Sequence, residues 1–546
     1  MGAADEKHRR TASRTFGVAN PVWLIVVLVV VTILLVHRLL PGPSPPPLPS
    51  YASADLKPKN YLNAPASAQN PFPFCPTNGP SDTLAAKYGA GTLSQTRSQL
   101  GSGYRIQRVL KRALSGQQVT ISIIGGSISA CHGAGDDPVS PKCYPSKFFD
   151  WWNTIFPHPA TEITNGAMRR TNSDYFGFCS GHHIPDVTDL VIVELDSDDT
   201  PDEEKTQNFE LLIRSLLTRP DQPAVLILGH FSPQVYQAYR YTGPDHWHDV
   251  VAGFYDVPHL STKPLLFNNF IQDPKSINKY YADAILANPD GHTLLADVLI
   301  AYFQHMTCSV WNIATGEEPD PNHTSDKSQD QGGNGGLFGG IGLRKGVPEP
   351  GFEKLDEDGE RIKPDASRKS TDPRLKVPPA LMSTRPADIS KFEEVEPYCV
   401  SANDLINPLP PSIFYGSGWM AYHPVSHAKQ DVEGGATAAH YFYSTLPLSR
   451  IRVPIVVGHG DVGIYYMREG RDKLMDGGSE IECWVDDNYN GRKVLSNFFE
   501  EGNGVHLTLT HIDHFVSRGS HFVECQLMGE EGKGVPMFKI VGIFAN

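Results

Sequence analysis

The stretch VTISIIGGSISAC, residues 119–131, decides how the rest of the chain is interpreted. Its first half is a run of apolar, β-branched residues that is long enough for one buried strand and too short for a helix. The run ends in Gly125-Gly126-Ser127, and paired glycines after a buried strand indicate a sharp turn with the backbone held close to its surroundings. Ligands of open α/β sheets bind beyond the carboxyl ends of the strands. Ser127 is therefore a candidate for chemistry, and a turn with no further role is the alternative.

Short apolar segments recur after this stretch and alternate with helical patterns. Further strands are expected at 160–164, 189–195 and 224–228, and helices at 104–114, 146–156, 202–219 and 291–306. Strands of this length alternating with helices predict a three-layer α/β/α domain with a doubly wound parallel sheet.

The composition narrows the class of protein. Hydrophobic residues make up 40% of the 546 residues and charged residues 20%, which are globular values. A formal net charge of -14 argues against nucleic acid as a partner. The eight cysteines form no CxxC pair, so they fit disulfides of a secreted chain better than a zinc ribbon. Cys131 and Cys143 are a plausible small loop, and the other pairings stay open.

The N-terminal region is typical of a membrane anchor. Residues 15–36 contain no charge, and Arg9, Arg10 and Arg14 are among the basic residues before them, which predicts a cytosolic N-terminus. We expect a cytosolic tail over 1–21, a transmembrane signal anchor over 22–40 and a proline-rich stem over 41–76. A cleaved signal peptide is the less favoured alternative. The protein would then be a single-pass type II membrane protein of the Golgi or the cell surface.

Three segments follow the stem. The α/β domain is expected over 77–313, a low-complexity linker over 314–394, and an all-β sandwich or jelly roll over 395–546, where six short alternating strands follow one another. In the last segment, His511-Ile512-Asp513-His514 has the composition of a metal cluster. The same four residues also fit the alternation of a strand, which is the interpretation we favour.

Four groups of residues in the α/β segment resemble the blocks of the SGNH (GDSL-type) hydrolases over roughly 119–303. They are Gly125-Gly126-Ser127-Ile128-Ser129, Asn165-Gly166-Ala167, Val193-Glu194-Leu195 with its acidic tail, and Asp283 ahead of Gly291-His292. The anchor, this segment and the tail DHFVSRGSHFVECQL together are similar to fungal capsule-associated proteins. The resemblance implies ester chemistry on an acylated sugar, with Ser127 as nucleophile, Asp283 as the acid that orients a histidine, and no cofactor or resident metal.

The chain departs from the family at three site positions. The family histidine of the Asp-x-x-His block falls on Leu286, the block II glycine on Arg170 and the block III asparagine on Asp198. We expect Arg170 and Asp198 to form an ion pair that fills the oxyanion hole, beside Gly126, Asn165 and Gly166. Alternatively, the Arg170 guanidinium donates to the oxyanion. His292 is the candidate replacement base, and His230 and His259 are weaker ones.

Three functions remain open on the sequence. The first is an esterase or acyltransferase acting on acyl esters, acetyl esters first among them, of a cell-surface polysaccharide. The second is a catalytically degenerate glycan-binding protein. The third, which is less favoured, is a glycosyltransferase in which Asp196-Ser197-Asp198 holds Mn²⁺ or Mg²⁺.

Overall fold

The structure is a computed structural model, and it describes most of the chain. The described residues are 14–15, 18–19, 23, 25–32, 55–63, 69–321, 372–394, 396–403, 415–422, 440–474, 477–500 and 504–546. They belong to two units, Met1–Ala52 and Ser53–Asn546, each of which is described by itself.

In the first unit, β1 (Arg14–Thr15) pairs with β2 (Val18–Ala19), and residues 23 and 25–32 are helical. The rest of the predicted anchor, most of the predicted cytosolic tail and residues 41–54 of the predicted stem lie outside the described residues. Within the described part of the chain, no helix combines the length and the apolar composition needed to cross a bilayer.

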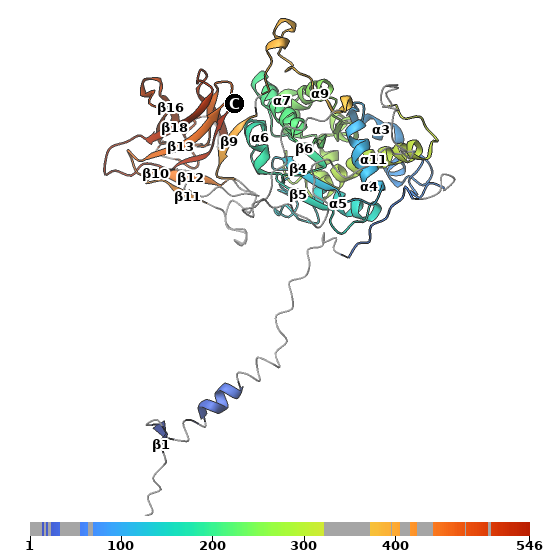
Figure 1. The fold of residues 1–546 in the computed structure, drawn as a ribbon, viewed down its shortest axis with the longest axis horizontal. Coiled ribbons are helices and arrows are strands. Elements are labelled where there is room, and N and C mark those ends of the chain that lie inside the picture. The colour runs from blue at the N-terminus through green and yellow to red at the C-terminus, as the bar shows by residue number, and fades with distance from the viewer. Residues whose placement is uncertain are drawn as a thin grey trace, which may run out of the picture. The chain divides into compact units, whose positions relative to one another are not determined.

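A six-stranded sheet forms the centre of the α/β domain (Figure 1), in the order β3-β8-β7-β6-β4-β5. Its strands are β3 (Arg97–Gln99), β4 (Thr120–Gly125), β5 (Glu162–Asn165), β6 (Leu190–Glu194), β7 (Ala224–Gly229) and β8 (His259–Ser261). The four predicted strands are confirmed, and they run parallel as expected. The sheet is mixed, however, because the unpredicted β3 pairs antiparallel with β8 at one edge.

Helices cover both faces of this sheet, as the predicted three layers require. The predicted helices are confirmed as α4 (Tyr104–Leu114), α5 (Tyr144–Ile155), α7 (Glu203–Thr218) and α11 (Pro289–Thr315). The unpredicted ones are α2 (Thr83–Tyr88), α3 (Ala90–Gln95), α6 (Ser173–Cys179), α8 (Pro233–Tyr239), α9 (Pro244–Phe254) and α10 (Lys263–Gln272). Helix α11 packs against α4 and α5, and α7 packs against α6 and α9.

The C-terminal segment forms the predicted β-sandwich. Its sheets have the orders β10-β13-β18-β15-β16 and β11-β12-β19-β14-β17, with β9 added to β19. The strands are β9 (Tyr398–Ser401), β10 (Tyr415–Ser417), β11 (Met420–Tyr422), β12 (Tyr441–Ser444), β13 (Arg450–Val457), β14 (Val462–Glu469), β15 (Glu480–Val485), β16 (Lys493–Ser496), β17 (Val505–Asp513), β18 (Gly519–Leu527) and β19 (Phe538–Ala545). Apolar residues alternate with exposed ones along β13, which is the pattern that predicted the sandwich.

The sandwich and the α/β domain share one hydrophobic core. Tyr465 of β14 and Phe544 of β19 are buried in the same cluster as Phe178 of α6, and the Phe178 and Phe544 rings stack at 5.1 Å. A disulfide joins Cys179 of α6 to Cys399 of β9. The two domains are therefore covalently and hydrophobically fixed to each other.

The end of the predicted linker also contacts the α/β domain. Within residues 372–394, Asp372 accepts a hydrogen bond from the Tyr104 hydroxyl at 2.7 Å. Glu394 accepts one from the Arg214 guanidinium at 2.8 Å. This part of the segment is therefore ordered on the body, whereas residues 322–371 lie outside the described residues.

All eight cysteines form disulfides. The predicted pair Cys131–Cys143 is confirmed. The pairs that the sequence left open are Cys75–Cys308, Cys179–Cys399 and Cys483–Cys525.

The shared core predicts that the two domains unfold together. We expect one calorimetric transition for the wild-type protein and, for Cys179→Ser/Cys399→Ser, a free energy of unfolding lower by about 2–5 kcal/mol, because this bridge closes the longest loop between the domains. Differential scanning calorimetry tests both expectations. Cys131→Ser/Cys143→Ser, whose loop is short, is the matched control and should lose less stability. Two separate transitions in the wild type would contradict the prediction.

Candidate functional site

Strand β4 delivers Ser127 to the carboxyl edge of the sheet through a turn that admits no side chain. All six residues of β4 are buried. A Cβ on Gly125 would lie 2.8 Å from the carbonyl oxygen of Glu194, and a Cβ on Gly126 would lie 2.3 Å from the carboxyl carbon of Asp198. The paired glycines therefore allow the serine turn to press directly against the end of β6.

The Ser127 hydroxyl accepts a hydrogen bond from the backbone N–H of Arg170, at 3.0 Å. Arg170 has a φ of 56°, in the left-handed region that favours glycine. The backbone at this position thus keeps the conformation expected of the family's glycine, while the Arg170 side chain is exposed. A main-chain donor therefore faces the serine hydroxyl.

The predicted ion pair between Arg170 and Asp198 is wrong. No ion pair joins these two described residues. The reason is that the left-handed backbone of Arg170 turns its amide to the serine and leaves its guanidinium at the surface. The alternative expectation, a guanidinium in the oxyanion hole, lacks support for the same reason.

Asp198 occupies the position of the family's asparagine and contacts the serine turn. Burial raises the pKa of its carboxyl group to about 7, although the Ser127 backbone N–H donates to it and the Ser197 hydroxyl does so at 3.3 Å. Its neighbour Glu194 is fully buried, and burial, together with the charge of Asp198, raises the pKa of Glu194 well above its ordinary value. Both carboxyl groups at this end of β6 therefore keep their protons to a higher pH than is ordinary for Asp and Glu.

Asp283, the predicted orienting acid, closes a turn. Its Oδ1 accepts hydrogen bonds from the backbone N–H groups of Ile285 at 2.7 Å and Leu286 at 2.6 Å. The side chain is exposed, and no hydrogen bond joins it to a histidine of the described chain. In this structure, Asp283 shapes the loop that corresponds to the family's Asp-x-x-His block.

His292, the predicted replacement base, is a core residue. It is 0% exposed, and its Nδ1 accepts a hydrogen bond from the Tyr144 backbone N–H at 3.3 Å. Its Nε2 is buried without a hydrogen-bond partner, and burial lowers the pKa of the ring to about 3. The Ser127 hydroxyl is not among its hydrogen-bond partners, so the structure does not bring these two predicted residues together.

Asn165 and Gly166 shape the site without pointing a donor at the serine hydroxyl. The Asn165 amide donates to the carbonyl oxygens of Ser129 at 2.8 Å and Pro138 at 3.0 Å, and so holds the loop after Ser127. A Cβ on Gly166 would lie 2.1 Å from the carbonyl oxygen of His183. Both residues are explained by close packing at the end of β5.

A buried chain of carboxylates and imidazoles lies behind the serine, and the sequence analysis missed most of it. Asp196 contacts Nδ1 of His248 at 2.6 Å and Nε2 of His259 at 3.2 Å. The other nitrogens of these rings contact Asp199 at 3.0 Å and Asp249 at 2.6 Å. Asp196 and His259 were both named from the sequence, but their contact was not predicted, and His248 lies in the unpredicted helix α9.

This network fixes charge inside the domain. Burial disfavours the charged form of each group, but the two imidazoles hold the pKa of Asp196 well below its usual range. Against the same burial, the carboxylates raise the pKa of His248 to about 9 and that of His259 to about 10. His259, predicted as a weak candidate for the base, is therefore charged and has both nitrogens engaged.

The same network removes the glycosyltransferase interpretation. Carboxylates that share one metal ion must converge on it, but Asp196 faces His248 and His259 whereas Asp198 faces the serine turn. Among the described residues, the group that brings three potential metal ligands together lies elsewhere and includes neither of these aspartates.

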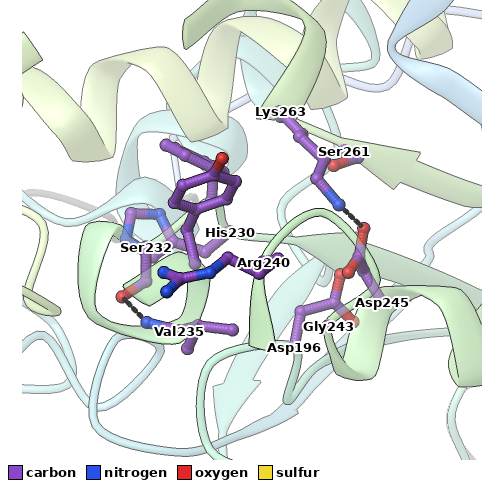
Figure 2. Close-up of a pocket in the computed structure, with 11 residues that line it drawn as sticks. Asp196, His230, Ser232, Val235, Arg240, Gly243, Asp245, Ser261 and Lys263 are labelled. Carbon is purple, nitrogen blue, oxygen red and sulfur yellow. Dashed lines mark hydrogen bonds and ion pairs between the residues drawn. The ribbon is translucent and has the colours of Figure 1, made fainter. Parts of the chain in front are cut away.

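A small pocket opens beside the network, over the ends of β7 and β8 (Figure 2). It has a cavity volume of about 20 Å³, which is room for roughly one water molecule. His230 lies on one side, and the ion pair of Lys263 with Asp245, 2.5 Å long, lies on the other. The pocket thus combines polar and charged groups at the edge of the sheet where Ser127 lies.

His230 differs from the other buried histidines near the strand ends. Its Nε2 lies 3.0 Å from the carbonyl oxygen of Ile285, which can only accept, so Nε2 carries the proton and Nδ1 keeps its lone pair. Burial lowers the pKa of His230 to about 4. A neutral imidazole therefore lines the pocket and contacts the loop in which the family carries its histidine.

The comparisons with known proteins identify the fold. No protein-family model matches the sequence, and no curated protein matches it either. Among solved structures, a two-domain esterase (CEX) active on acetylated mannans matches with a TM-score of 0.54 and 17% identity. The match covers 83% of this chain and 98% of that one. The same esterase co-crystallised with mannopentaose matches with a TM-score of 0.53, 17% identity and coverage of 83% and 97%.

The two-domain fold is therefore shared with an esterase over almost the whole length of that protein. The similarity spans both domains of this chain, since the match covers 83% of it. At 17% identity it establishes the fold, and the residues of the site must be argued from their own geometry.

The raised pKa of Asp198 predicts a pH-dependent stability. The folded chain binds this proton more tightly than the unfolded chain, where the pKa is ~3.9, so the contribution is fully present below pH ~4 and is lost as the pH rises through about 7. Between pH 4 and 8, the free energy of unfolding of the wild type should fall by up to about 4 kcal/mol more than that of Asp198→Asn. Denaturant titrations at several pH values test this. The control is Asp283→Asn, which changes an exposed carboxylate and should behave as the wild type does. If the free energy of unfolding depends on pH equally in the wild type and in Asp198→Asn, the prediction is wrong.

Proposed function

We propose that this protein is an SGNH-type serine esterase that removes acyl groups, acetyl first among them, from a cell-surface polysaccharide. The observation that carries the proposal is the hydrogen bond from the left-handed Arg170 amide to the Ser127 hydroxyl at the end of β4. The proposed substrate class is supported by the fold shared with the esterase active on acetylated mannans. Transfer of the acyl group to another hydroxyl would use the same first half-reaction. A capsule-type polysaccharide, suggested by the resemblance to fungal capsule-associated proteins, is one such substrate.

The first chemical step is attack of the Ser127 oxygen on the ester carbonyl. The serine proton passes to a base, the sugar hydroxyl leaves with a proton, and water then hydrolyses the acyl-serine. In the tetrahedral intermediate, the Arg170 N–H is positioned to donate to the oxyanion. Asp198 in its protonated form supplies a second donor, since a neutral carboxylic acid has one O–H.

We assign the base to His230. It directly follows β7 and contacts the Ile285 carbonyl, in the loop that carries the histidine in the family that the sequence resembles. Strand β6 lies between β4 and β7, so the two strand ends are about 10 Å apart. The free Nδ1 of the neutral ring is the atom that takes the proton.

The cysteines and the N-terminal sequence support a location of this protein in the secretory pathway. Four disulfides suit an oxidising compartment. With the uncharged segment 15–36 and the basic residues before it, they support a type II membrane protein whose body lies in the lumen of the secretory pathway or outside the cell.

Removing the nucleophile should abolish ester hydrolysis. For Ser127→Ala we expect the rate on acetylated mannan or a small acetyl ester to fall at least about 10²–10⁴-fold, and labelling by a fluorophosphonate probe to disappear.

The wild-type rate should be bell-shaped in pH, rising as His230 loses its proton near pH 4 and falling as Asp198 loses its own near pH 7. Asp198→Asn should remove the alkaline limb. A rate that keeps rising above pH 8 would contradict this assignment.

The assignment of the base is tested with three histidine variants. His230→Gln keeps a donor for the Ile285 carbonyl but cannot take a proton, so kcat should fall about 10²–10⁴-fold at similar thermal stability. His246→Gln, on the exposed His246, should leave kcat unchanged. His292→Gln should lower the melting temperature, because His292 is buried, and should leave the kcat of the folded protein largely unchanged. If kcat is lost in His292→Gln but kept in His230→Gln, the general base is His292 and the assignment to His230 is wrong.

A second candidate function, glycan binding without turnover, is favoured by one observation. Asp198 takes the Ser127 backbone N–H, which an oxyanion hole ordinarily offers to the substrate, and Leu286 cannot act as a base. In that case neither wild type nor Ser127→Ala reacts with the fluorophosphonate, and both retain oligosaccharides on a glycan array equally.

A further inference from the structure

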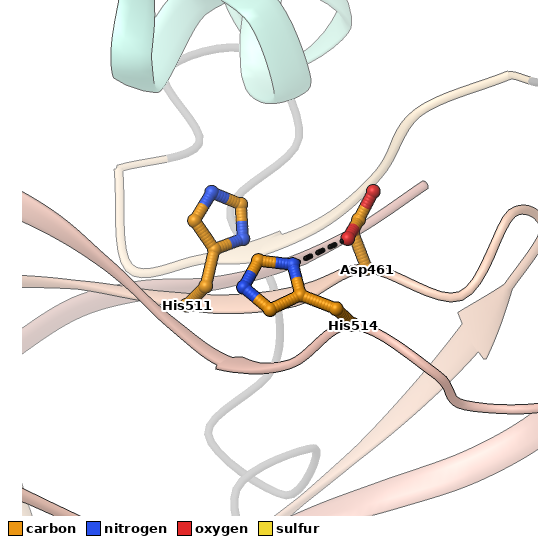
Figure 3. A group of neighbouring side chains, drawn as sticks. All are labelled: Asp461, His511 and His514. Carbon is orange, nitrogen blue, oxygen red and sulfur yellow. Dashed lines mark hydrogen bonds and ion pairs between the residues drawn. The ribbon is translucent and has the colours of Figure 1, made fainter. Parts of the chain in front are cut away.

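Three potential metal ligands meet at one edge of the β-sandwich. One ligand atom from each of Asp461, His511 and His514 lies within 4.8 Å of the others. Figure 3 shows a ring nitrogen of His511 turned towards Asp461 and His514, and the His514 Nδ1 contacts the Asp461 carboxylate at 2.7 Å. None of these residues belongs to the serine site.

A β-bulge brings the two histidines to the same side of the strand. In β14 and β17, Val462 pairs with Asp513, but the next residue, Gly463, pairs with His511, so Ile512 is an extra residue. Without the bulge, residues three apart in a strand point to opposite faces. The alternation that we favoured from the sequence is therefore wrong at this point, and the irregularity produces the cluster.

The cluster leaves an unsatisfied polar atom. The Nδ1 of His511 is buried and has no hydrogen-bond partner, which is costly for a polar group. Glu204 of α7 and Asp174 of α6 add negative potential at His511. Each of these features favours a cation.

We propose that Asp461, His511 and His514 bind one divalent transition-metal ion, Zn²⁺ before others. Two imidazoles and a carboxylate are a common zinc ligand set, and a fourth position remains for water. Bonds of about 2.0–2.2 Å place neighbouring ligand atoms about 3.4 Å apart. The three ligand atoms now lie within 4.8 Å of one another, and the His514 side chain, which is 56% exposed, has room to rotate towards that spacing. The ion holds the β14–β17 edge, beside the junction with α6 and α7, and this role is independent of the proposed ester chemistry.

Metal content and spectroscopy of the full-length protein test the proposal. After chelation and dialysis against Zn²⁺, we expect about one tightly held zinc per chain, and a higher melting temperature with zinc than without. Co²⁺ in its place should give the visible absorption of a tetrahedral site. His511→Ala/His514→Ala should weaken binding at least about 100-fold, beyond the loss expected for partners that only orient a ligand.

The controls separate this site from other sources of binding. His506→Ala removes an exposed histidine of the same strand and should bind zinc as the wild type does. Asp461→Asn, a smaller change, should weaken binding and leave the far-ultraviolet circular dichroism unchanged. Zinc binding that is absent in the wild type, or equal in the wild type and the double variant, would overturn the proposal. Fluorophosphonate labelling of Ser127 should be the same in all four proteins, so failure here and failure of the esterase proposal are distinguishable.

Discussion

The Asp196 carboxylate, buried between His248 and His259, is the constraint on which the arrangement of the α/β domain depends. An ionised carboxylate out of water is costly unless it is paired and fully hydrogen-bonded. The pairing ties the end of β6 to α9 and β8, because the two histidines come from those elements. It also reaches β7, where a Cβ on Gly229 would lie 2.2 Å from the Asp196 carboxylate. Four parts of the chain must therefore meet before this charge is stabilised.

The pairing at Asp196 also decides the state of its neighbours. Its two imidazoles are already engaged, so Glu194 and Asp198 have no positive partner of their own, and burial raises the pKa of both. The carboxyl group beside Ser127 is thus a proton donor in mild acid and an anion in mild base.

The parts of the fold that the sequence predicts are those with local causes. Strands β4 and β6 are continuous apolar runs that end in glycines or aspartates, and these signals lie within a few neighbouring residues. Strand β8 has only three residues and begins with a charged histidine, so no pattern marks it. The contact of Asp196 with His248 and the disulfide of Cys179 with Cys399 join residues far apart in the chain. Spacing carries no information about such pairs, which arise only when the sheet is assembled.

The three departures from the pattern of the SGNH hydrolases would affect the proposed ester chemistry to different degrees. A backbone donor survives most substitutions, whereas a side-chain donor is lost or changed when the residue is replaced. The donor at Arg170 is a main-chain amide, and any residue that adopts the left-handed conformation supplies it, so the loss of glycine there leaves the chemistry intact. The donor at Asp198 is a side chain, and replacing an amide with a carboxyl group makes it conditional on pH. Leu286 alone removes a function outright, and only a group from another strand can restore it. His230 touches the same loop at Ile285 from the end of β7. Under the proposed esterase function, turnover would therefore depend on this one histidine more than on the two oxyanion positions.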